Sequence, residues 1–192
     1  MDLLQSFIDF STNFISKGGI PFGFFLVMLE SFVPILPLSL FVALNVNAFG
    51  FLIGCFISWL GTCIGSYCCF LFFSYLEDKF TTKFLNRKMI KKIHTSIDRF
   101  KNINFTELVL ILTLPFTPSF LVNILSGLTK MSHNKFVSAL LIGKSFTIIF
   151  WGYIGKSIIE SITDYKSIIY IVITLGISYG ISKLVSKKWN IE

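Results

Sequence analysis

Two apolar stretches of this chain are each interrupted by a pair of prolines. The pair Pro34–Pro37 falls within residues 19–46, and the pair Pro115–Pro118 falls within residues 107–128. A proline inside a helix removes a backbone hydrogen bond and clashes with the preceding turn, at a cost of about 3 kcal/mol. In lipid no water satisfies the freed carbonyl groups, so broken backbone persists only inside protein or beside a wet cavity. Each stretch is therefore predicted to be a helix–turn–helix hairpin that dips into the bilayer; a spanning helix over 19–33 is the alternative for the first.

The composition indicates that these stretches lie in a membrane. Hydrophobic residues make up 54% of the 192 residues and charged residues only 14%, whereas a typical soluble domain has about 25% charged residues. The 23 phenylalanines exceed what a soluble core of this size would bury, so we expect a surface that faces lipid. Segments 49–76, 136–155 and 167–185 are predicted to be transmembrane helices, because a span requires about 20 apolar residues. Residues 1–18 are shorter and are predicted to form an interfacial helix.

The positive charge of the chain is concentrated in one loop. Eight Lys or Arg residues and four Asp or Glu residues lie between Glu77 and Glu107. Residues 79–101 are predicted to form a basic amphipathic helix on the membrane surface. Basic loops of membrane proteins face the cytoplasm and its anionic leaflet. We therefore expect loop 77–107 and the C-terminus to be cytoplasmic, anionic inner-leaflet lipids to be partners, and nucleic acid not to be a partner.

These segments predict an all-α, multi-pass integral protein of the plasma membrane. The predicted fold has two inverted re-entrant hairpins, each followed by a transmembrane helix, together with a C-terminal transmembrane helix and the basic amphipathic helix. The predicted parts of the chain are an N-terminal interfacial helix at 1–18, an inverted-repeat membrane domain at 19–156, and a C-terminal transmembrane helix with a basic tail at 157–192.

The two proline-broken segments correspond to each other. Each has an upstream glutamate, Glu30 or Glu107, and a downstream asparagine, Asn45 or Asn123. In the predicted topology the two segments have opposite orientations, which makes them an inverted repeat. In secondary transporters, paired interrupted segments of this kind mark a binding site near the middle of the membrane. The alternative is that the prolines only introduce kinks that help helices to pack.

Two charged residues are predicted to act at such a site. Glu30 is the only acidic or basic side chain between Gly18 and Tyr75, so we expect it to face a cavity, to have a partner or to be protonated. Its alternative is an interfacial position near a hairpin mouth. Lys144 lies within a predicted span and is the candidate for a lipid phosphate, because an ammonium group is a compact phosphate-binding charge. The alternatives for Lys144 are extension to the inner interface and pairing with Glu30 or Glu107.

Uncharged polar residues lie close to the second proline pair. Candidates to line the second hairpin are Thr113, Thr117, Ser119 and Asn123. These side chains would either satisfy the opened backbone or contact a ligand. The helices that begin after Pro37 and Pro118 are expected to direct backbone amides at an anionic headgroup.

The prolines, glycines and polar residues also form an ordered set along the chain. In order, the set is Glu30, Pro34, Pro37, Gly61, Gly65, Tyr67, Pro115, Pro118, Asn123, Gly127, Leu128, Phe136, Gly143, Gly152 and Gly155. Over about residues 20–156 this set resembles the DedA / VTT-domain superfamily, also called the SNARE-associated Golgi protein family. The resemblance implies two facing re-entrant hairpins and lipid translocation. Bacterial members are associated with undecaprenyl phosphate or phosphatidylethanolamine, and eukaryotic members with phospholipid scrambling.

The chain departs from the family pattern at two positions. Thr113 stands where members commonly have an arginine, and Ser66 stands where they often have an acid. Both departures weaken the case for proton-coupled transport of a carrier lipid, and they leave lipid handling open. The predicted lipid-binding or gating residues are Glu30, Pro34, Pro37, Thr113, Pro115, Pro118, Asn123 and Lys144.

Other classes of function lack the residues that they need. The sequence has no His-Glu-x-x-His motif, no carboxylate cluster and no Ser–His pair within an apolar segment, so no enzyme activity is expected. Cys55, Cys63, Cys68 and Cys69 lack metal-ligand spacing and are predicted to pack as apolar residues, and we expect no metal and no other cofactor. The alternatives to a lipid translocase are a small-solute or ion secondary transporter and a non-transporting membrane scaffold, and the pattern leaves a homo-oligomer open.

Overall fold

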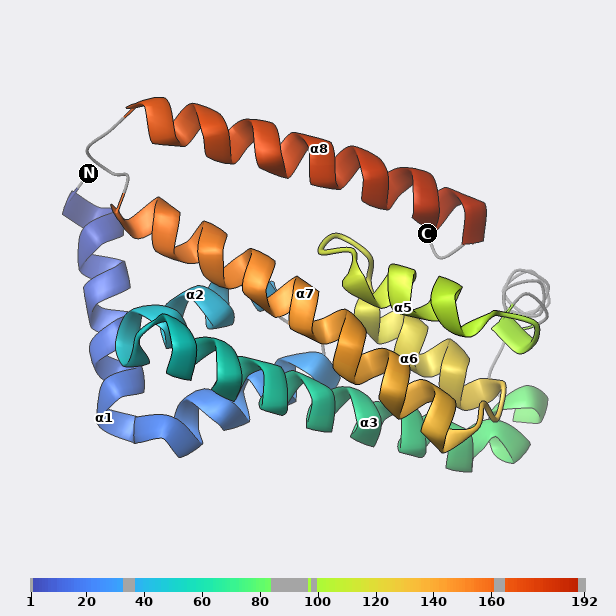
Figure 1. Cartoon of the computed structure of the whole chain (residues 1–192). Helices are drawn as coiled ribbons and strands as arrows, with labels where there is room; N and C mark the ends of the chain where they lie inside the picture. Colours follow the sequence, from blue (N-terminus) through green and yellow to red (C-terminus); the bar gives the residue numbers. More distant parts are fainter. Residues whose placement is uncertain (1, 33–36, 84–96, 98–99, 161–164, 190–192) are drawn as a thin grey trace.

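The computed structural model describes residues 2–32, 37–83, 97, 100–160 and 165–189, and all regular structure in these residues is helical (Figure 1). Its principal helices are α1 (Asp2–Phe32), α2 (Leu38–Phe49), α3 (Phe51–Lys83), α5 (Phe105–Thr113), α6 (Ser119–Leu128), α7 (His133–Glu160) and α8 (Tyr165–Trp189). The prediction of an all-α fold is confirmed for this part of the chain.

The helices end and begin at the proline pairs. Helix α2 begins directly after Pro37, and α6 begins directly after Pro118. Helix α5 ends at Thr113, two residues before Pro115. Pro34 lies outside the described residues, but α1 ends at Phe32. The predicted interruption of both apolar stretches is therefore confirmed, because neither continues as one helix through its prolines.

Helix α1 is bent near its middle. Gly19 has φ 69° and ψ −175°, a backbone conformation that favours glycine, and Pro21 follows it. Figure 1 shows the change of direction between the two arms of α1. The predicted boundary between 1–18 and 19–156 coincides with this kink.

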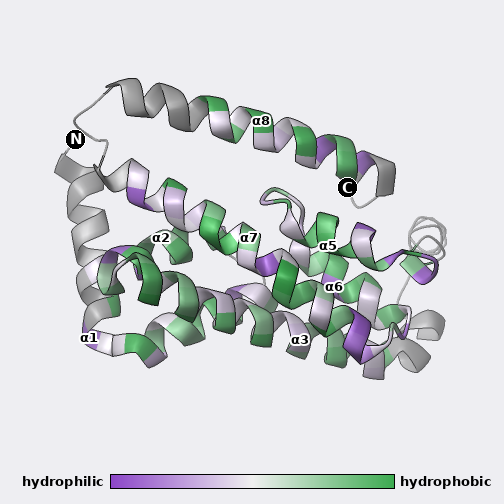
Figure 2. Ribbon diagram, in the orientation of Figure 1, coloured by the Kyte–Doolittle hydropathy of each residue, from purple (hydrophilic) through white to green (hydrophobic). Residues whose placement is uncertain are grey.

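Two helices are long and apolar enough to cross a membrane. Within the described residues they are Phe51–Leu76 of α3 and His133–Ser157 of α7. Large hydrophobic side chains point away from the protein, with Leu52 81% and Phe146 59% exposed, and hydrophobic colouring extends along most of both helices (Figure 2). The third predicted span, 167–185, falls within α8, where the described side chains form the shorter apolar segment Ile173–Val185.

Helices of the first half of the fold (α1, α2 and α3) pack against helices of the second half (α5, α6 and α7). Helix α1 packs against α3 and α5 packs against α7, so the helix before each break lies on the long helix of its own half. After the breaks, α2 also packs against α7, and α6 packs against α3. Each short helix that follows a break therefore contacts the long helix of the other half.

Glycines bring the long helices close to their neighbours. A Cβ atom on Gly65 would lie 2.2 Å from the Met28 carbonyl oxygen, and one on Gly61 would lie 2.8 Å from the Phe24 carbonyl oxygen. These distances confirm that the Gly61-x-x-x-Gly65 motif allows close helix packing. On α7, a Cβ atom on Gly143 would lie 2.6 Å from the Leu112 Cβ atom of α5.

The main buried cluster lies where α3, α5, α6 and α7 meet. Its centre includes the stacked rings of Phe70 and Phe136, whose centroids are 4.4 Å apart. Of the predicted basic surface helix 79–101, the first residues continue α3 as far as Lys83, and most of the remainder lies outside the described residues.

Candidate functional site

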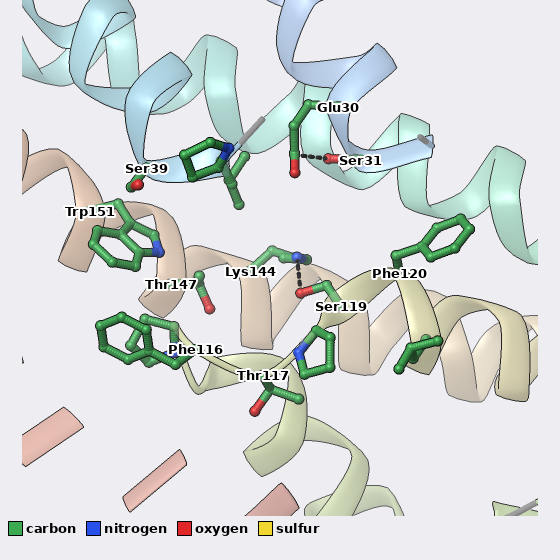
Figure 3. A pocket seen from close by; sticks show the side chains of 15 residues that line it. Glu30, Ser31, Ser39, Phe116, Thr117, Ser119, Phe120, Lys144, Thr147 and Trp151 are labelled. Carbon is green, nitrogen blue, oxygen red and sulfur yellow. Dashed lines mark hydrogen bonds between the residues drawn. The ribbon is translucent and has the colours of Figure 1, made fainter. Parts of the chain in front are cut away.

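A pocket of about 450 Å³ lies between the two interrupted regions (Figure 3). Its walls come from the end of α1, the starts of α2 and α6, the α5–α6 connection and the middle of α7. The lining residues are Glu30, Ser31, Pro37, Leu38, Ser39, Pro115, Phe116, Thr117, Pro118, Ser119, Phe120, Leu121, Lys144, Thr147 and Trp151. The structure thus brings together five predicted site residues: Glu30, Pro37, Pro115, Pro118 and Lys144.

Two helix N-termini form part of the pocket wall. Pro37 and Pro118 occupy the N-cap positions of α2 and α6. The first-turn N–H groups of a helix have no acceptor within that helix, and the helix dipole makes this end partially positive. Both residues after these prolines, Leu38 and Ser119, line the pocket. The predicted start of a helix after each second proline is confirmed, and the arrangement favours a negatively charged group in the pocket.

Lys144 is a buried cation in this wall. It is only 1% exposed, and its Nζ atom donates a hydrogen bond to Ser119 Oγ over 2.8 Å. An ammonium group has three donor hydrogens. The side chain does not extend to the surface, and no salt bridge joins it to Glu30 or Glu107, all three residues being within the described part of the chain. Among the described residues, the hydrogen-bond partner of the Lys144 ammonium group is thus a neutral hydroxyl.

Glu30 also lines the pocket, and its carboxylate points toward Lys144 (Figure 3). Its carboxylate accepts a hydrogen bond from Ser31 Oγ over 3.5 Å, and the side chain is partly exposed. The acid comes from α1 of the first half and the base comes from α7 of the second half. The two opposite charges face one space from separate elements.

Glu107 does not correspond to Glu30 in the structure. Its Oε2 atom accepts a hydrogen bond from the Asn104 backbone N–H over 3.0 Å and completes a capping box at the start of α5. The interpretation of Glu107 as the repeat partner of Glu30, and as a partner for Lys144, is therefore wrong. The sequence already indicates this role, because Asn104-x-x-Glu107 has the spacing of a capping box.

Thr147 supports the second break from the neighbouring helix. Its hydroxyl lies 2.8 Å from the Leu112 carbonyl oxygen and 2.9 Å from the Thr113 carbonyl oxygen. These carbonyls lie in the last turn of α5, where no continuing helix supplies donors. Thr113 itself bonds within α5, donating to the Val109 carbonyl oxygen over 2.8 Å, and does not line the pocket. Thr147 is not among the predicted site residues; its signal in the sequence is a hydroxyl three residues after Lys144 in an apolar span.

The two asparagines differ. Asn45 Nδ2 donates to Ser58 Oγ over 3.0 Å and to the Gly23 carbonyl oxygen over 3.3 Å, which joins α2 to α3 and α1. Asn123 of α6 is fully buried, and neither its amide oxygen nor its amide nitrogen has a hydrogen-bond partner in the described part of the chain. Asn123 is not a lining residue of the pocket, so a role in ligand contact stays a prediction.

Aromatic residues that the sequence analysis did not single out complete one wall. The rings of Phe116 and Trp151 meet edge to face, with centroids 5.3 Å apart. Both residues line the pocket. Phe116 lies between Pro115 and Pro118, in the connection from α5 to α6. It reaches the pocket wall because this connection lies beside α7.

The cysteines pack among apolar residues. Cys55, Cys63 and Cys69 are buried and Cys68 is exposed, all with free thiols. The described part of the chain has no group of three metal-ligating side chains. The predicted role of the cysteines as small apolar residues is confirmed for the three buried ones.

In the described residues, the fold and the site define a helical protein with two membrane-length helices and, between two interrupted helix pairs, a largely apolar pocket that contains one acid and one base. The VTT domain model matches residues 33–157 of the chain. The chain therefore belongs to the VTT-domain family, which confirms the resemblance seen in the sequence.

Two proteins of Bacillus subtilis (strain 168) are similar to the chain. The membrane protein YhjE is 30% identical over 168 residues, which are 87% of this chain and 80% of YhjE. The protein YqeD is 31% identical over 134 residues, which are 68% of this chain and 63% of YqeD. No solved structure matches the chain. Together with the two apolar helices, the similarity to YhjE indicates that this chain is a membrane protein.

Proposed function

We propose that this chain is a lipid translocase or scramblase, with a phospholipid or a polyprenyl phosphate as its substrate. The headgroup crosses through the pocket while the acyl chains remain in lipid. The observation that carries this proposal is Lys144, a buried ammonium group beside two helix N-termini at the junction of the two breaks. A buried charge is costly and is usually retained for function.

The phosphate end of a headgroup matches one side of the pocket. Lys144 donates to Ser119, and its remaining N–H groups are suited to phosphate oxygens. The starts of α2 and α6 add backbone N–H groups and the positive ends of two helix dipoles. This side therefore suits a phosphate without requiring the arginine that other family members have at the position of Thr113.

Glu30 gives the pocket a second, negative side. The lining residues contain one acid, Glu30, and one base, Lys144. A zwitterionic headgroup would place its phosphate at Lys144 and its amine at Glu30. A polyprenyl phosphate would leave the Glu30 carboxylate uncompensated unless it is protonated. Of the two lipid classes, the charge arrangement favours a phospholipid with an amine.

The proposed membrane arrangement is an inverted repeat. In it, α1 and α2 form one re-entrant hairpin and α5 and α6 form the other, with opposite orientations. The packing between the two halves supports this arrangement, because α2 contacts α7 and α6 contacts α3. Loop 77–107 and the C-terminus face the cytoplasm in this proposal, and the membrane is the plasma membrane. The proposed partners are membrane lipids, including anionic inner-leaflet lipids.

Reconstitution tests the proposal. Purified protein in liposomes is given phospholipids with fluorescent headgroups or a labelled polyprenyl phosphate, with and without a pH gradient. We expect headgroup movement between leaflets above that of protein-free liposomes, and faster movement of an amine-bearing phospholipid. Flux of soluble ions without any lipid movement would contradict the proposal and favour a solute transporter.

Substitutions of Lys144 and Glu30 test the proposed headgroup contacts most directly. Lys144→Ala should slow headgroup movement about ten- to hundredfold, because hydrogen bonds to charged groups contribute about 1.5–3 kcal/mol. Glu30→Gln should slow an amine-bearing lipid more than a polyprenyl phosphate. Lys17→Ala removes an exposed lysine of α1 and is the matched control. Wild-type rates in both pocket variants would remove these residues from the mechanism.

A further inference from the structure

Helix α8 lies outside residues 33–157, which the family model matches, and it makes fewer contacts with α7 and α5 than those two helices make with each other. Among its described side chains only Ser182 is buried. Gly176 and Gly180 have no atom within 4 Å of an added Cβ, whereas Gly65 and Gly143 are in close helix contacts. Figure 1 shows α8 running across one side of the helix bundle, with the α5–α6 connection reaching toward it.

One chain of aromatic rings joins α8 to the pocket. The Tyr179 ring of α8 meets the Phe116 ring edge to face, with centroids 5.7 Å apart and an interplanar angle of 85°. Phe116 in turn meets Trp151 of α7 at 5.3 Å. Phe116 and Trp151 line the pocket, so the contact with Tyr179 is made from behind the pocket wall.

We propose that α8 is a movable support behind one wall of the pocket, and that the contact between Tyr179 and Phe116 is the latch that holds the α5–α6 connection in that wall. This inference rests on the proposed function for its purpose, because a headgroup needs a lateral way in while its acyl chains stay outside. Release of the latch frees the connection and widens the pocket on the side of α8.

The contact between Tyr179 and Phe116 is weak enough to break and re-form. An edge-to-face aromatic pair contributes modestly beyond the area that it buries, so thermal motion breaks and remakes it, and its loss shifts the balance between two states. Around it, the connection between α5 and α6 is held by the Thr117 N–H to Leu114 carbonyl bond at 3.3 Å.

In lipid, movement of α8 away from the other helices costs little free energy. Lipid tails are as apolar as the helix surface, so no hydrophobic driving force holds two helices together in the bilayer and specific contacts decide their association. The exposed side chains of α8, among them Ile177 at 60% and Leu184 at 73%, are suited to lipid. Moving α8 therefore exchanges apolar neighbours for lipid over much of its described surface, and its specific contacts include Tyr179 with Phe116 and the packing of Val185 on the core cluster.

The first test compares lipid movement in Tyr179→Ala and Tyr179→Phe. Both are reconstituted in phospholipid liposomes with a fluorescent-headgroup phospholipid as the probe. The latch predicts movement about three- to tenfold faster in Tyr179→Ala, the change expected from one aromatic pair, and an unchanged rate in Tyr179→Phe, which keeps the ring. Tyr153→Ala is the matched control, because Tyr153 of α7 is 66% exposed and does not line the pocket.

The second test does not depend on transport. Thr117 lines the pocket and is 5% exposed, and its hydroxyl has no partner in the described residues. Thr117→Cys, in a background with Cys68→Ser, reports access to the pocket through its rate of labelling by a water-soluble thiol reagent. The latch predicts about three- to tenfold faster labelling when Tyr179→Ala is added and no change when Tyr179→Phe is added.

Each outcome decides the inference. Equal rates for wild type and Tyr179→Ala, slower rates in Tyr179→Ala, or equal effects of the alanine and phenylalanine variants would overturn the latch. If Tyr179→Ala is not recovered as folded protein, Tyr179→Leu removes the ring at similar size and carries the same expectation. Absence of lipid movement in the wild type would contradict the proposed function alone, since labelling at position 117 still tests the latch.

Discussion

The two proline-broken regions share a spacing of prolines but differ in what holds them. The first is tied to its surroundings: α2 packs back on α1, and Asn45 bonds to both α1 and α3. In the second, α5 packs on α7 while α6 packs on α3, and Asn123 has no recorded partner in the described residues. The first region is thus held by a side chain of its own, whereas the second is held from α7 by Thr147 and Lys144. We infer that the second region contributes the more adaptable wall of the pocket.

The largest expected difference concerns the glycines of α3 and α7 that pack against the two regions. Gly65→Ala should lower the free energy of unfolding by about 3 kcal/mol, because the added methyl group meets the Met28 backbone, which cannot yield easily. Gly143→Ala should cost less, about 2 kcal/mol, since the added methyl group meets the Leu112 Cβ atom at 2.6 Å, whereas the carbonyl oxygen that Gly65→Ala meets lies at 2.2 Å. Thermal unfolding in detergent measures both. An equal loss in the two variants would contradict the view that the first region is the more rigid.

A second comparison uses the two asparagines. Asn45→Leu should cost about 1–3 kcal/mol, because Ser58 and the Gly23 carbonyl lose a buried partner. Asn123→Leu should leave stability unchanged or raise it, since a buried amide without partners is costly to keep. Unfolding midpoints of the two variants, at matched detergent concentration, give the answer.

The asparagine result also bears on function. If Asn123→Leu is as stable as the wild type but moves lipid more slowly, Asn123 serves the transport cycle. If Asn123→Leu is strongly destabilised, its amide has a structural partner and the contrast with Asn45 fails.

The smallest expected effect concerns the hydroxyls around the second break. Thr147→Val should cost about 1 kcal/mol, because the carbonyls of Leu112 and Thr113 lose a donor from α7. Thr113→Val should cost less, since its hydroxyl bonds only within its own helix. Thermal unfolding again separates the two, and a larger loss for Thr113→Val would show that the α5–α7 bond does not support the break.

Much of this arrangement could be predicted from local sequence rules. The helix breaks follow from the backbone chemistry of proline, and the long apolar helices follow from composition. The meeting of Glu30 and Lys144 at one pocket was predicted from the scarcity of charge in apolar segments, although the absence of a salt bridge between them was not. These features depend on residue type more than on which helices touch.

The remaining features depend on tertiary contacts. The bonds from Thr147 to α5, the place of Phe116 and Trp151 in the pocket wall and the contact of Tyr179 with Phe116 require knowledge of which helix lies beside which. The role of Glu107 was a different kind of error. The capping box of Glu107 is visible in the sequence as Asn104-x-x-Glu107, and this local rule predicts its role better than the match to Glu30 across the repeat does.

The most direct test of the pocket is to find where a headgroup binds. Reconstituted protein is photolabelled with a phospholipid that carries a diazirine in its headgroup, and the modified residues are mapped by mass spectrometry. The account predicts adducts on lining residues such as Ser119 and Trp151, with their yield reduced in Lys144→Ala and unchanged in Lys17→Ala. Adducts confined to outward-facing residues such as Leu52 and Phe146, with none in the pocket, would contradict it.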